Sequence, residues 1–384
     1  MMAENYTVSK PDWVPEHANE QFACTVMGGI EGVKDTTVGN INPAISSGQL
    51  KPKHRLVLSE DEYVSGVSQG SRMTLARAIT LIESNNPHHF AKAQRVLQRL
   101  LPLTGKALRI GITGVPGAGK STMIEALGNM LCDAGHRVAI LTVDPTSSVT
   151  RGSILGDKTR MGTLSRRPEA FIRPSPAGGT LGGVARKSRE TMLMCEAAGY
   201  DIILIETVGV GQSETTVRSM VDFFMLVVLT GAGDELQGIK KGIMELADAI
   251  VINKADGDNL ERAKLAAAQF RNALHLFPAP ESGWTPQVLT YSGFYNIGVQ
   301  EVWDMVYKYI DFVKDNGYFE YRRNEQSKYW MYETINEQLR DSFYHNPTIE
   351  AMLADKESQV LKGNLTSFVA AKNLLDTYFA GLKN

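Results

Sequence analysis

The chain has 384 residues, 43% of them apolar, which is enough for one large α/β core with additional helical segments. Its 40 Lys and Arg residues nearly balance 42 Asp and Glu residues, so no basic field would attract nucleic acid or an anionic membrane, and neither is expected as a partner. The apolar run from Phe223 to Leu229 is far shorter than the roughly 18 residues needed to cross a bilayer, which excludes a membrane-spanning segment.

The cysteines and the first residues indicate the compartment. Cys24, Cys132 and Cys195 lie far apart and form no C-x-x-C motif, and two of them fall in apolar helix-like stretches where small buried residues belong. The acidic N-terminal residues resemble neither an Arg-rich transit peptide nor a secretory signal. We therefore expect a cytoplasmic protein with reduced cysteines.

The beginning of the chain divides into an arm and a helical segment. Residues 1–60 show no sustained period and contain several glycines and prolines among polar residues, which predicts an extended or partly disordered arm. Residues 61–105 form the helical segment. Between Val64 and Leu103 the apolar positions recur at helical spacing and are interrupted at Asn86-Pro87, which predicts a helical hairpin.

From residue 106 to residue 315, short apolar runs alternate with amphipathic helical stretches. This alternation is typical of an α/β fold with a doubly wound, mostly parallel sheet covered by helices on both faces. After Gly317 the pattern is helical to the end, so residues 316–384 are expected to form a helical arm that packs on the same chain or on a second subunit. The expected strands are residues 107–113, 138–143, 202–205, 223–229, 249–252 and 288–290.

A complete G-x-x-x-x-G-K-[ST] motif follows the first expected strand and opens a helix, as a phosphate-binding P-loop requires. Its glycines let backbone N–H groups face phosphate oxygens, and the helix N-terminus favours negative charge. Lys120 would bridge the terminal phosphates, and Ser121 would bind Mg²⁺. The motif predicts nucleotide binding by Gly114, Val115, Pro116, Gly117, Ala118, Gly119, Lys120, Ser121 and Thr122.

Three acidic residues are candidate magnesium ligands beside Ser121, because Mg²⁺ prefers hard oxygen ligands. Asp144 and Glu206 each end an expected strand, and Asp157 lies in a polar loop. The carboxyl ends of the strands open onto the nucleotide crevice of a doubly wound sheet, so these carboxylates can converge there. Each alone would also fit a solvated loop position. Gly209 and Gly211 follow Glu206 and give a flexible loop that can sense a γ-phosphate.

The motif Asn253-Lys254-Ala255-Asp256 directly follows an expected strand and matches the N-K-x-D pattern of GTPases. The Asp256 carboxylate can accept hydrogen bonds from guanine N1–H and the exocyclic amine, which adenine does not offer, so it predicts guanine specificity. Ser292, after the next strand, is the expected support for the base, although Gly293 follows it where many GTPases have Ala. Residues 106–315 are therefore expected to form a GTPase domain that binds GTP or GDP with Mg²⁺.

From about Ser71 to Phe379 the chain resembles the G-protein chaperones of methylmalonyl-CoA mutase, which are also named lysine/arginine/ornithine transport ATPases. The matching stretches are residues 114–122, 143–147, 152–161, 206–214, 231–242 and 253–256. The resemblance implies a GTP hydrolase that gates cobalamin loading and protects or reactivates an adenosylcobalamin-dependent methylmalonyl-CoA mutase or a related acyl-CoA mutase. It also implies a homodimer with the C-terminal helices as dimerisation arm.

The resemblance assigns Asp144, Asp157 and Glu206 to the magnesium and switch apparatus, in agreement with the strand-end argument. Residues 231–242 would form an additional switch toward the mutase; a glycine-rich connector with solvated lysines is the alternative. The switch residues so predicted are Gly209, Gly211, Gln212, Asp234, Gln237, Lys240 and Lys241. No His has Asp two residues before it, so the cobalamin-binding D-x-H-x-x-G pattern is absent and cobalamin would belong to the partner.

Two departures limit what the resemblance carries over. Residues 1–65 match nothing in the family. In Ras-like GTPases a catalytic Gln directly follows the switch glycine, but here Val210 follows Gly209 and Gln212 comes later, so we expect slow intrinsic hydrolysis that a partner stimulates. The catalytic residues are then predicted as Lys120, Asp157 and Glu206, with Asp157 or a backbone group positioning the attacking water.

Other functions fit the sequence less well. A GTPase that inserts metal centres would need a metal-handling stretch, but the seven histidines are scattered apart from His88-His89. A transport-coupled ATPase or kinase for basic amino acids would prefer ATP, against which Asp256 argues. A scaffold that binds nucleotide without turnover would not need Lys120, Ser121 and the acidic set.

Overall fold

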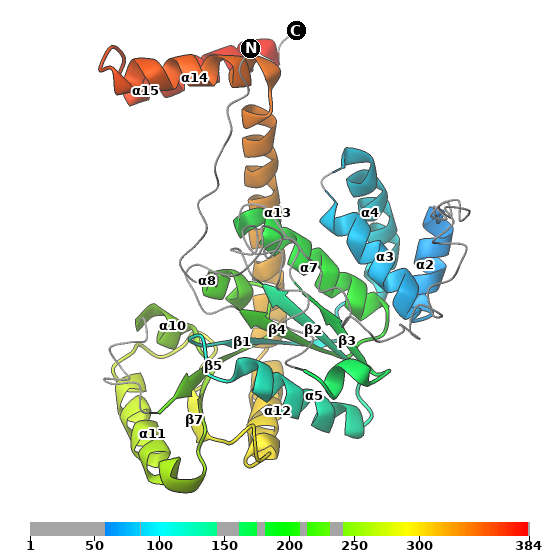
Figure 1. Ribbon diagram of the computed structural model, residues 1–384, viewed down its shortest axis with the longest axis vertical. Coiled ribbons are helices and arrows are strands. Elements are labelled where there is room, and N and C mark those ends of the chain that lie inside the picture. The colour runs from blue at the N-terminus through cyan, green and yellow to red at the C-terminus, as the bar shows by residue number, and fades with distance from the viewer. Residues whose placement is uncertain are drawn as a thin grey trace, which may run out of the picture. The chain divides into compact units, whose positions relative to one another are not determined.

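The computed structural model describes residues 58–84, 86–143, 161–174, 181–207, 213–230 and 241–382. The chain divides into two units, Met1–Val57 and Leu58–Asn384, and all described residues belong to the second. Except for its last three residues, the arm predicted at 1–60 lies outside the described residues. The secondary-structure elements are therefore those of the second unit (Figure 1).

Three helices, rather than the predicted hairpin, precede the sheet: α2 (Glu60–Ser68), α3 (Arg72–Glu83) and α4 (Pro87–Leu100). The additional helix α2 begins with a capping box, in which Ser59 and Glu62 satisfy each other's backbone N–H groups. The predicted interruption falls where expected, because Asn86 caps α4 and accepts a hydrogen bond from His88 N–H. A short 3₁₀ turn, η2 (Leu101–Leu103), leads into the sheet.

The sheet has seven described strands in the order β3-β2-β4-β1-β5-β6-β7, and every neighbouring pair is parallel. The predicted α/β class is confirmed. The strands are β1 (Leu108–Thr113), β2 (Val138–Val143), β3 (Ala170–Arg173), β4 (Ile202–Thr207), β5 (Phe223–Leu229), β6 (Ala249–Asn253) and β7 (Gln287–Thr290). β1 lies at the centre, so its carboxyl end, from which the P-loop leaves, is flanked by the ends of β4 and β5.

Helices cover both faces of this sheet, with α5 and α12 on one side and α7 and α8 on the other (Figure 1). Alternate residues of one strand accordingly enter different cores: Ile202 and Leu204 of β4 join the core under α5 and α12, whereas Ile203 and Ile205 join the core under α7. A third core forms between β5, β6, α10 and α11. The covering helices are α5 (Lys120–Asp133), α7 (Leu181–Ala197), α8 (Ser213–Arg218), α10 (Lys241–Leu246), α11 (Leu260–Leu274) and α12 (Val299–Asp315), with the short 3₁₀ turns η3 (Leu164–Arg166) and η4 (Gly257–Asn259).

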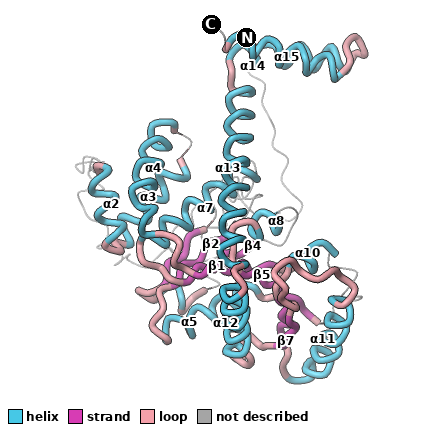
Figure 2. Tube along the Cα trace, turned by 180° about the vertical axis from the view of Figure 1, so that it is seen from behind, coloured by secondary structure: helices cyan, strands magenta, loops and turns pink. Residues whose placement is uncertain are grey.

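Helix α13 (Tyr318–Tyr344) follows α12 and packs along the back of the domain (Figure 2). Its buried residues Phe319, Arg322, Gln326 and Trp330 recur every three or four positions and so form one stripe. Three of these side chains donate hydrogen bonds to carbonyl groups between α8 and β5. Arg322 bonds Asp222 O at 2.8 Å, Gln326 bonds Val221 O at 2.8 Å, and Trp330 bonds Ser219 O at 3.1 Å.

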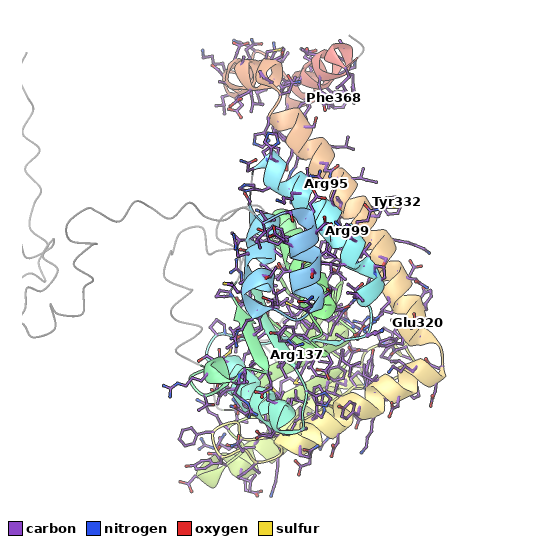
Figure 3. All side chains as sticks on the ribbon, turned by 90° about the vertical axis from the view of Figure 1, so that its right-hand side faces the viewer. Arg95, Arg99, Arg137, Glu320, Tyr332 and Phe368 are labelled. Atoms are coloured by element: carbon purple, nitrogen blue, oxygen red, sulfur yellow. The ribbon has the colours of Figure 1, made fainter. Side chains whose placement is uncertain are left out.

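Two further helices, α14 (Pro347–Leu361) and α15 (Ser367–Gly381), complete the tail and pack against each other. Their core is small and consists of Ile349, Leu374 and Tyr378, with Phe343 of α13 beside it. Most other apolar tail residues are exposed, including Tyr332 on α13 and Phe368 on α15 (Figure 3). Among the described residues, no helix is long and apolar enough to cross a membrane.

Candidate functional site

The P-loop connects the end of β1 to the start of α5, and its backbone leaves no room for side chains at two glycines. Gly114 has φ +148°, and a Cβ there would lie 2.1 Å from Val227 O of the neighbouring strand. Gly119, the N-cap of α5, has φ +88°, and a Cβ there would lie 2.0 Å from Asn253 Nδ2. Only glycine fits both constraints. The loop is therefore shaped by contacts with two other strands.

Two side chains of α5 extend the P-loop toward the strand ends. Lys120 is buried, and its Nζ donates hydrogen bonds to Gly114 O at 2.7 Å and to Val115 O at 3.2 Å. The hydroxyl of Ser121 donates to Glu206 Oε1 at 3.2 Å. Glu206 lies in β4 beside β1 in the sheet, with an exposed fraction of 9%. The structure thus brings together the predicted phosphate lysine, the predicted metal serine and one predicted metal carboxylate.

Glu206 and Ser121 offer a carboxylate and a hydroxyl oxygen, which are hard ligands that suit Mg²⁺. Asp144 and Asp157, the other predicted ligands, lie outside the described residues, as do Gly209, Gly211, Gln212, Asp234, Gln237 and Lys240 among the predicted switch residues. Only the backbone of Lys241, at the start of α10, is described. Within the described ranges no cluster of three His, Cys, Asp or Glu residues could hold a metal ion.

Asn253, the last residue of β6, connects three segments of the site. Its Nδ2 donates to Ala118 O in the P-loop at 2.9 Å, and its Oδ1 accepts from Lys254 N at 2.7 Å and from Gly293 N at 3.4 Å. The side chain is 4% exposed, so these bonds form in a largely dry environment. Asn253 therefore braces the P-loop against the two loops that follow β6 and β7.

The carboxylate of Asp256 is oriented by the loop after β7. Ser292 Oγ donates to Asp256 Oδ2 at 2.5 Å, and Tyr295 N–H donates to the same hydroxyl at 3.3 Å. Ala255 N–H bonds Tyr291 O at 3.0 Å, so the backbones of the two loops are joined as well. The structure thus places Asp256 and Ser292, which were each predicted to contact guanine, in direct contact with each other. A carboxylate held in this way is preorganised to accept hydrogen bonds from a ligand.

The presence of glycine at position 293, where many GTPases have Ala, has a steric explanation. A Cβ at this position would lie 3.2 Å from Thr122 Cγ2 and 3.2 Å from a ring carbon of Tyr291, which is tighter than ordinary van der Waals contact. Tyr291 is fully buried, and burial raises the pKa of its hydroxyl. Because the Tyr291 ring fills the space behind the loop, glycine is the residue that lets the loop approach α5.

Sequence reasoning missed two contributions to the site. Asn259 donates to Thr230, at the end of β5, and to Lys254 O at 2.7 Å, which ties the N-K-x-D loop to a third strand. Thr113 and Thr207 form a buried hydroxyl pair at 2.8 Å between β1 and β4. Thr113 and Thr207 end their strands and Thr230 directly follows β5, which was the available signal in the sequence; Asn259, in η4, has no comparable signal.

Known proteins resemble this chain over most of its length. The family model described as "Methylmalonyl Co-A mutase-associated GTPase MeaB" matches residues 75–348. A putative GTPase of Caulobacter vibrioides is 53% identical over 309 residues, which cover 80% of this chain and 94% of that protein. The Mus musculus protein named "Methylmalonic aciduria type A homolog, mitochondrial" is 45% identical over 328 residues, which cover 83% of this chain and 79% of that protein.

A solved structure titled "Crystal structure of LAO/AO transport system kinase" superimposes with a TM-score of 0.67 at 36% identity, covering 84% of this chain and 99% of that one. The parallel sheet, the P-loop and these relatives define a P-loop GTPase, an enzyme that binds guanine nucleotide and hydrolyses GTP. Within that class, the chain belongs to the MeaB family of methylmalonyl-CoA mutase-associated GTPases.

Proposed function

We propose that this GTPase is a chaperone of an adenosylcobalamin-dependent methylmalonyl-CoA mutase or a related acyl-CoA mutase. In this proposal its nucleotide cycle gates cobalamin loading and protects or reactivates the mutase. The match of residues 75–348 to the mutase-associated family carries the proposal, since it extends from α3 into α14 and includes the whole sheet. Cobalamin would be held by the partner, because the chain lacks the D-x-H-x-x-G pattern.

Guanine would be read by Asp256, with Asn253, Lys254 and Ser292 arranging the loops around it. The hydrogen bond from Ser292 Oγ occupies one side of the Asp256 carboxylate and fixes its direction. A base that lacks the matching donors would leave this oriented carboxylate without hydrogen bonds to the ligand, which lowers its affinity. This geometry supports a preference for GTP over ATP and disfavours a transport-coupled ATPase or kinase.

The phosphates would be bound by the backbone of residues 114–119 together with Lys120, Ser121 and Thr122. Magnesium, when bound, would neutralise phosphate charge, and Ser121, Asp144, Asp157 and Glu206 would hold it. The Ser121–Glu206 hydrogen bond supports the shared location of two members of this set. Lys120 would stabilise charge on the transferred phosphoryl group, and Asp157 or a backbone group would position water, giving slow turnover that the partner stimulates.

The nucleotide state would reach the partner through two switch segments, one containing Gly209, Gly211 and Gln212 and the other residues 231–242. Helix α8 directly follows residues 208–212 and helix α10 directly follows residues 231–240, both of which lie outside the described ranges. The two helices pack against each other. A conformational change in one segment would therefore be transmitted, through the contact between α8 and α10, to the helix that follows the other segment.

The exposed tail residues support a homodimer joined through α13, α14 and α15. Tyr332, Ile335 and Leu339 recur along one side of α13, and Phe368, Leu375 and Phe379 along one side of α15, all of them exposed. Exposed apolar stripes of this kind mark interaction surfaces. We place the dimer in a reducing cytoplasmic compartment, because Cys132 and Cys195 are buried and unpaired.

The decisive experiment measures phosphate release from GTP and from ATP, with and without cobalamin-loaded methylmalonyl-CoA mutase. GTP-only turnover that rises with mutase is the expected result. Equal hydrolysis of ATP would overturn the base assignment, and a rate unaffected by mutase would overturn the partner assignment. In the same assay Asp157→Asn should lower turnover strongly, and unchanged turnover would remove Asp157 from the mechanism.

A further inference from the structure

Two aromatic side chains lie exposed on the loop that orients Asp256. Phe294 is 80% exposed and Tyr295 is 62% exposed, and their ring centroids are 5.0 Å apart at an interplanar angle of 85°. Exposing two large rings to water is unfavourable, and neither ring is a member of a hydrophobic core of the domain. Their position therefore calls for an explanation other than packing.

The loop that carries these rings is rigidly held. Ser292 and Ile297 exchange backbone hydrogen bonds of 2.9 and 3.0 Å, so residues 293–296 form a closed turn. Gly298, with φ +76°, follows the turn and caps α12. At its other end the turn is tied to Asn253 through Gly293 N–H. The rings are thus presented on a fixed backbone, so little backbone ordering is lost when they bind a ligand.

The same turn connects the aromatic pair to the base-reading carboxylate. Ser292 Oγ lies 2.5 Å from Asp256 Oδ2 and accepts from the backbone N–H of Tyr295 at 3.3 Å. The backbone of Tyr295 is therefore two hydrogen bonds away from the atom that would pair with the edge of guanine. A flat ring whose edge is bound at Asp256 would therefore lie beside the turn that carries Phe294 and Tyr295.

We propose that the Phe294–Tyr295 pair stacks on the face of the bound purine, so that Asp256 reads the edge and the aromatic pair supplies affinity that does not depend on base identity. The proposal rests on the base assignment of Asp256. Because the two rings are nearly perpendicular, one ring stacks on the base while the other supports it edge to face. Every purine has a π-face, so the aromatic pair should stack on guanine and adenine alike. Discrimination between the two bases is left to Asp256.

The test measures dissociation constants for GDP, IDP and ADP by calorimetry with the full chain and with Phe294→Ala, Tyr295→Ala and the double variant. Removing an aromatic stack typically weakens binding by about fivefold to a hundredfold. At least one single variant should show this loss, and the loss should be the same for GDP and IDP, because both present the same ring face. Phe294→Tyr and Tyr295→Phe keep the rings and should retain the affinity.

Two controls separate the stacking from its alternatives. Leu276→Ala removes a residue that is 85% exposed in the loop after α11 and should leave all three constants unchanged. Asp256→Asn should weaken GDP binding and reduce the preference for GDP over ADP. If Asp256→Asn behaves in this way while both alanine variants bind GDP like the wild type, the stacking is overturned and the base assignment stands. If Asp256→Asn has no effect, the base assignment itself fails.

A spectroscopic readout tests the stacking directly. Tryptophan fluorescence is sensitive to contact with a base, so Phe294→Trp places a reporter on the turn. Addition of GDP to this variant should change its emission beyond the change seen in wild type, which has four tryptophans of its own. Tyr295→Trp is tested in the same way. If both variants respond to GDP as wild type does, the proposal is contradicted.

Discussion

The nucleotide-binding domain buries most of its large apolar side chains, whereas the helical tail exposes many of them. In the domain, Phe224 of β5 is fully buried between the sheet and its helices, whereas Phe368 of α15 is 78% exposed. The change occurs within α13: Trp330 is the last buried residue of this helix, and Tyr332, two positions later, is 61% exposed. The described part of the domain therefore buries most of its large apolar side chains in its own cores, whereas the tail exposes apolar side chains of the kind found at interaction surfaces.

The largest effect is expected from a deletion in the domain core. Phe224→Ala removes a buried ring from β5 and should lower the free energy of unfolding by about 3–5 kcal/mol, because the cavity cannot fully collapse. Urea denaturation followed by circular dichroism measures this change. Leu276→Ala, which removes an exposed side chain, is the control and should change the same quantity by less than about 1 kcal/mol. A loss of similar size in both variants would contradict the contrast between core and surface.

The next effect concerns the ion pair that fixes α13 to the domain. Arg323 donates to both carboxylate oxygens of Asp222 at 2.8 and 2.7 Å, and the Asp222 side chain is 1% exposed. Arg323→Met would leave this buried carboxylate without its charged partner, so the free energy of unfolding should fall by about 3 kcal/mol.

An exposed pair in the same helix provides the matched comparison. Lys328 and Glu325 form an ion pair of 2.7 Å on the surface of α13, where solvent screens it. Lys328→Met should leave the urea midpoint close to that of wild type. If Arg323→Met also leaves the urea midpoint unchanged, the attachment of α13 to the domain does not depend on this buried pair.

A smaller effect, in association rather than in folding, is expected from the tail. Tyr332→Ala and Phe368→Ala each remove an exposed aromatic ring and should weaken self-association by about tenfold or more, since aromatic side chains dominate interface energies. Sedimentation velocity over a dilution series gives the dissociation constant. Leu276→Ala, on the nucleotide-binding domain, should not change it. A monomeric wild-type protein would contradict the proposed homodimer.

The smallest expected signal concerns the cysteines of the domain. Burial raises the pKa of the thiols of Cys132 and Cys195, so at pH 8 both remain protonated in the folded protein and react slowly with thiolate-specific reagents. In a Cys24→Ser background, a colorimetric thiol reagent should detect almost no reactive thiol until urea is added. Rapid labelling of Cys195 without denaturant would show that α7 opens readily and that the domain is less complete than its packing indicates.

The sequence revealed the sheet because its strands are buried on both faces and appear as continuous apolar runs. It did not reveal β3, an edge strand of four residues, Ala170–Arg173, with too few apolar positions to stand out. Helix α2 was missed for a similar reason, since it buries only Tyr63 and Val67, although the Ser59 and Glu62 capping box was a local signal for its start.

For the site, local motifs were readable and their mutual contacts were not. The P-loop and the N-K-x-D motif are each short and contiguous in sequence, so their residue patterns identify them. The hydrogen bond from Asn253 to Ala118 joins residues 135 positions apart and depends on the packing of β1, β5 and β6. The exposed rings of Phe294 and Tyr295 follow no periodic pattern, so their place beside Asp256 appears only in three dimensions.

The brace formed by Asn253 has a consequence for biosynthesis. The P-loop is translated early, but the amide that supports its carbonyl at Ala118 and fills the space beside Gly119 is supplied by the end of β6. The hydroxyl that orients Asp256 comes later still, from Ser292 beyond β7. A growing chain on the ribosome can therefore form the contacts that brace the P-loop and orient Asp256 only after the last described strand of the sheet has emerged from the exit tunnel.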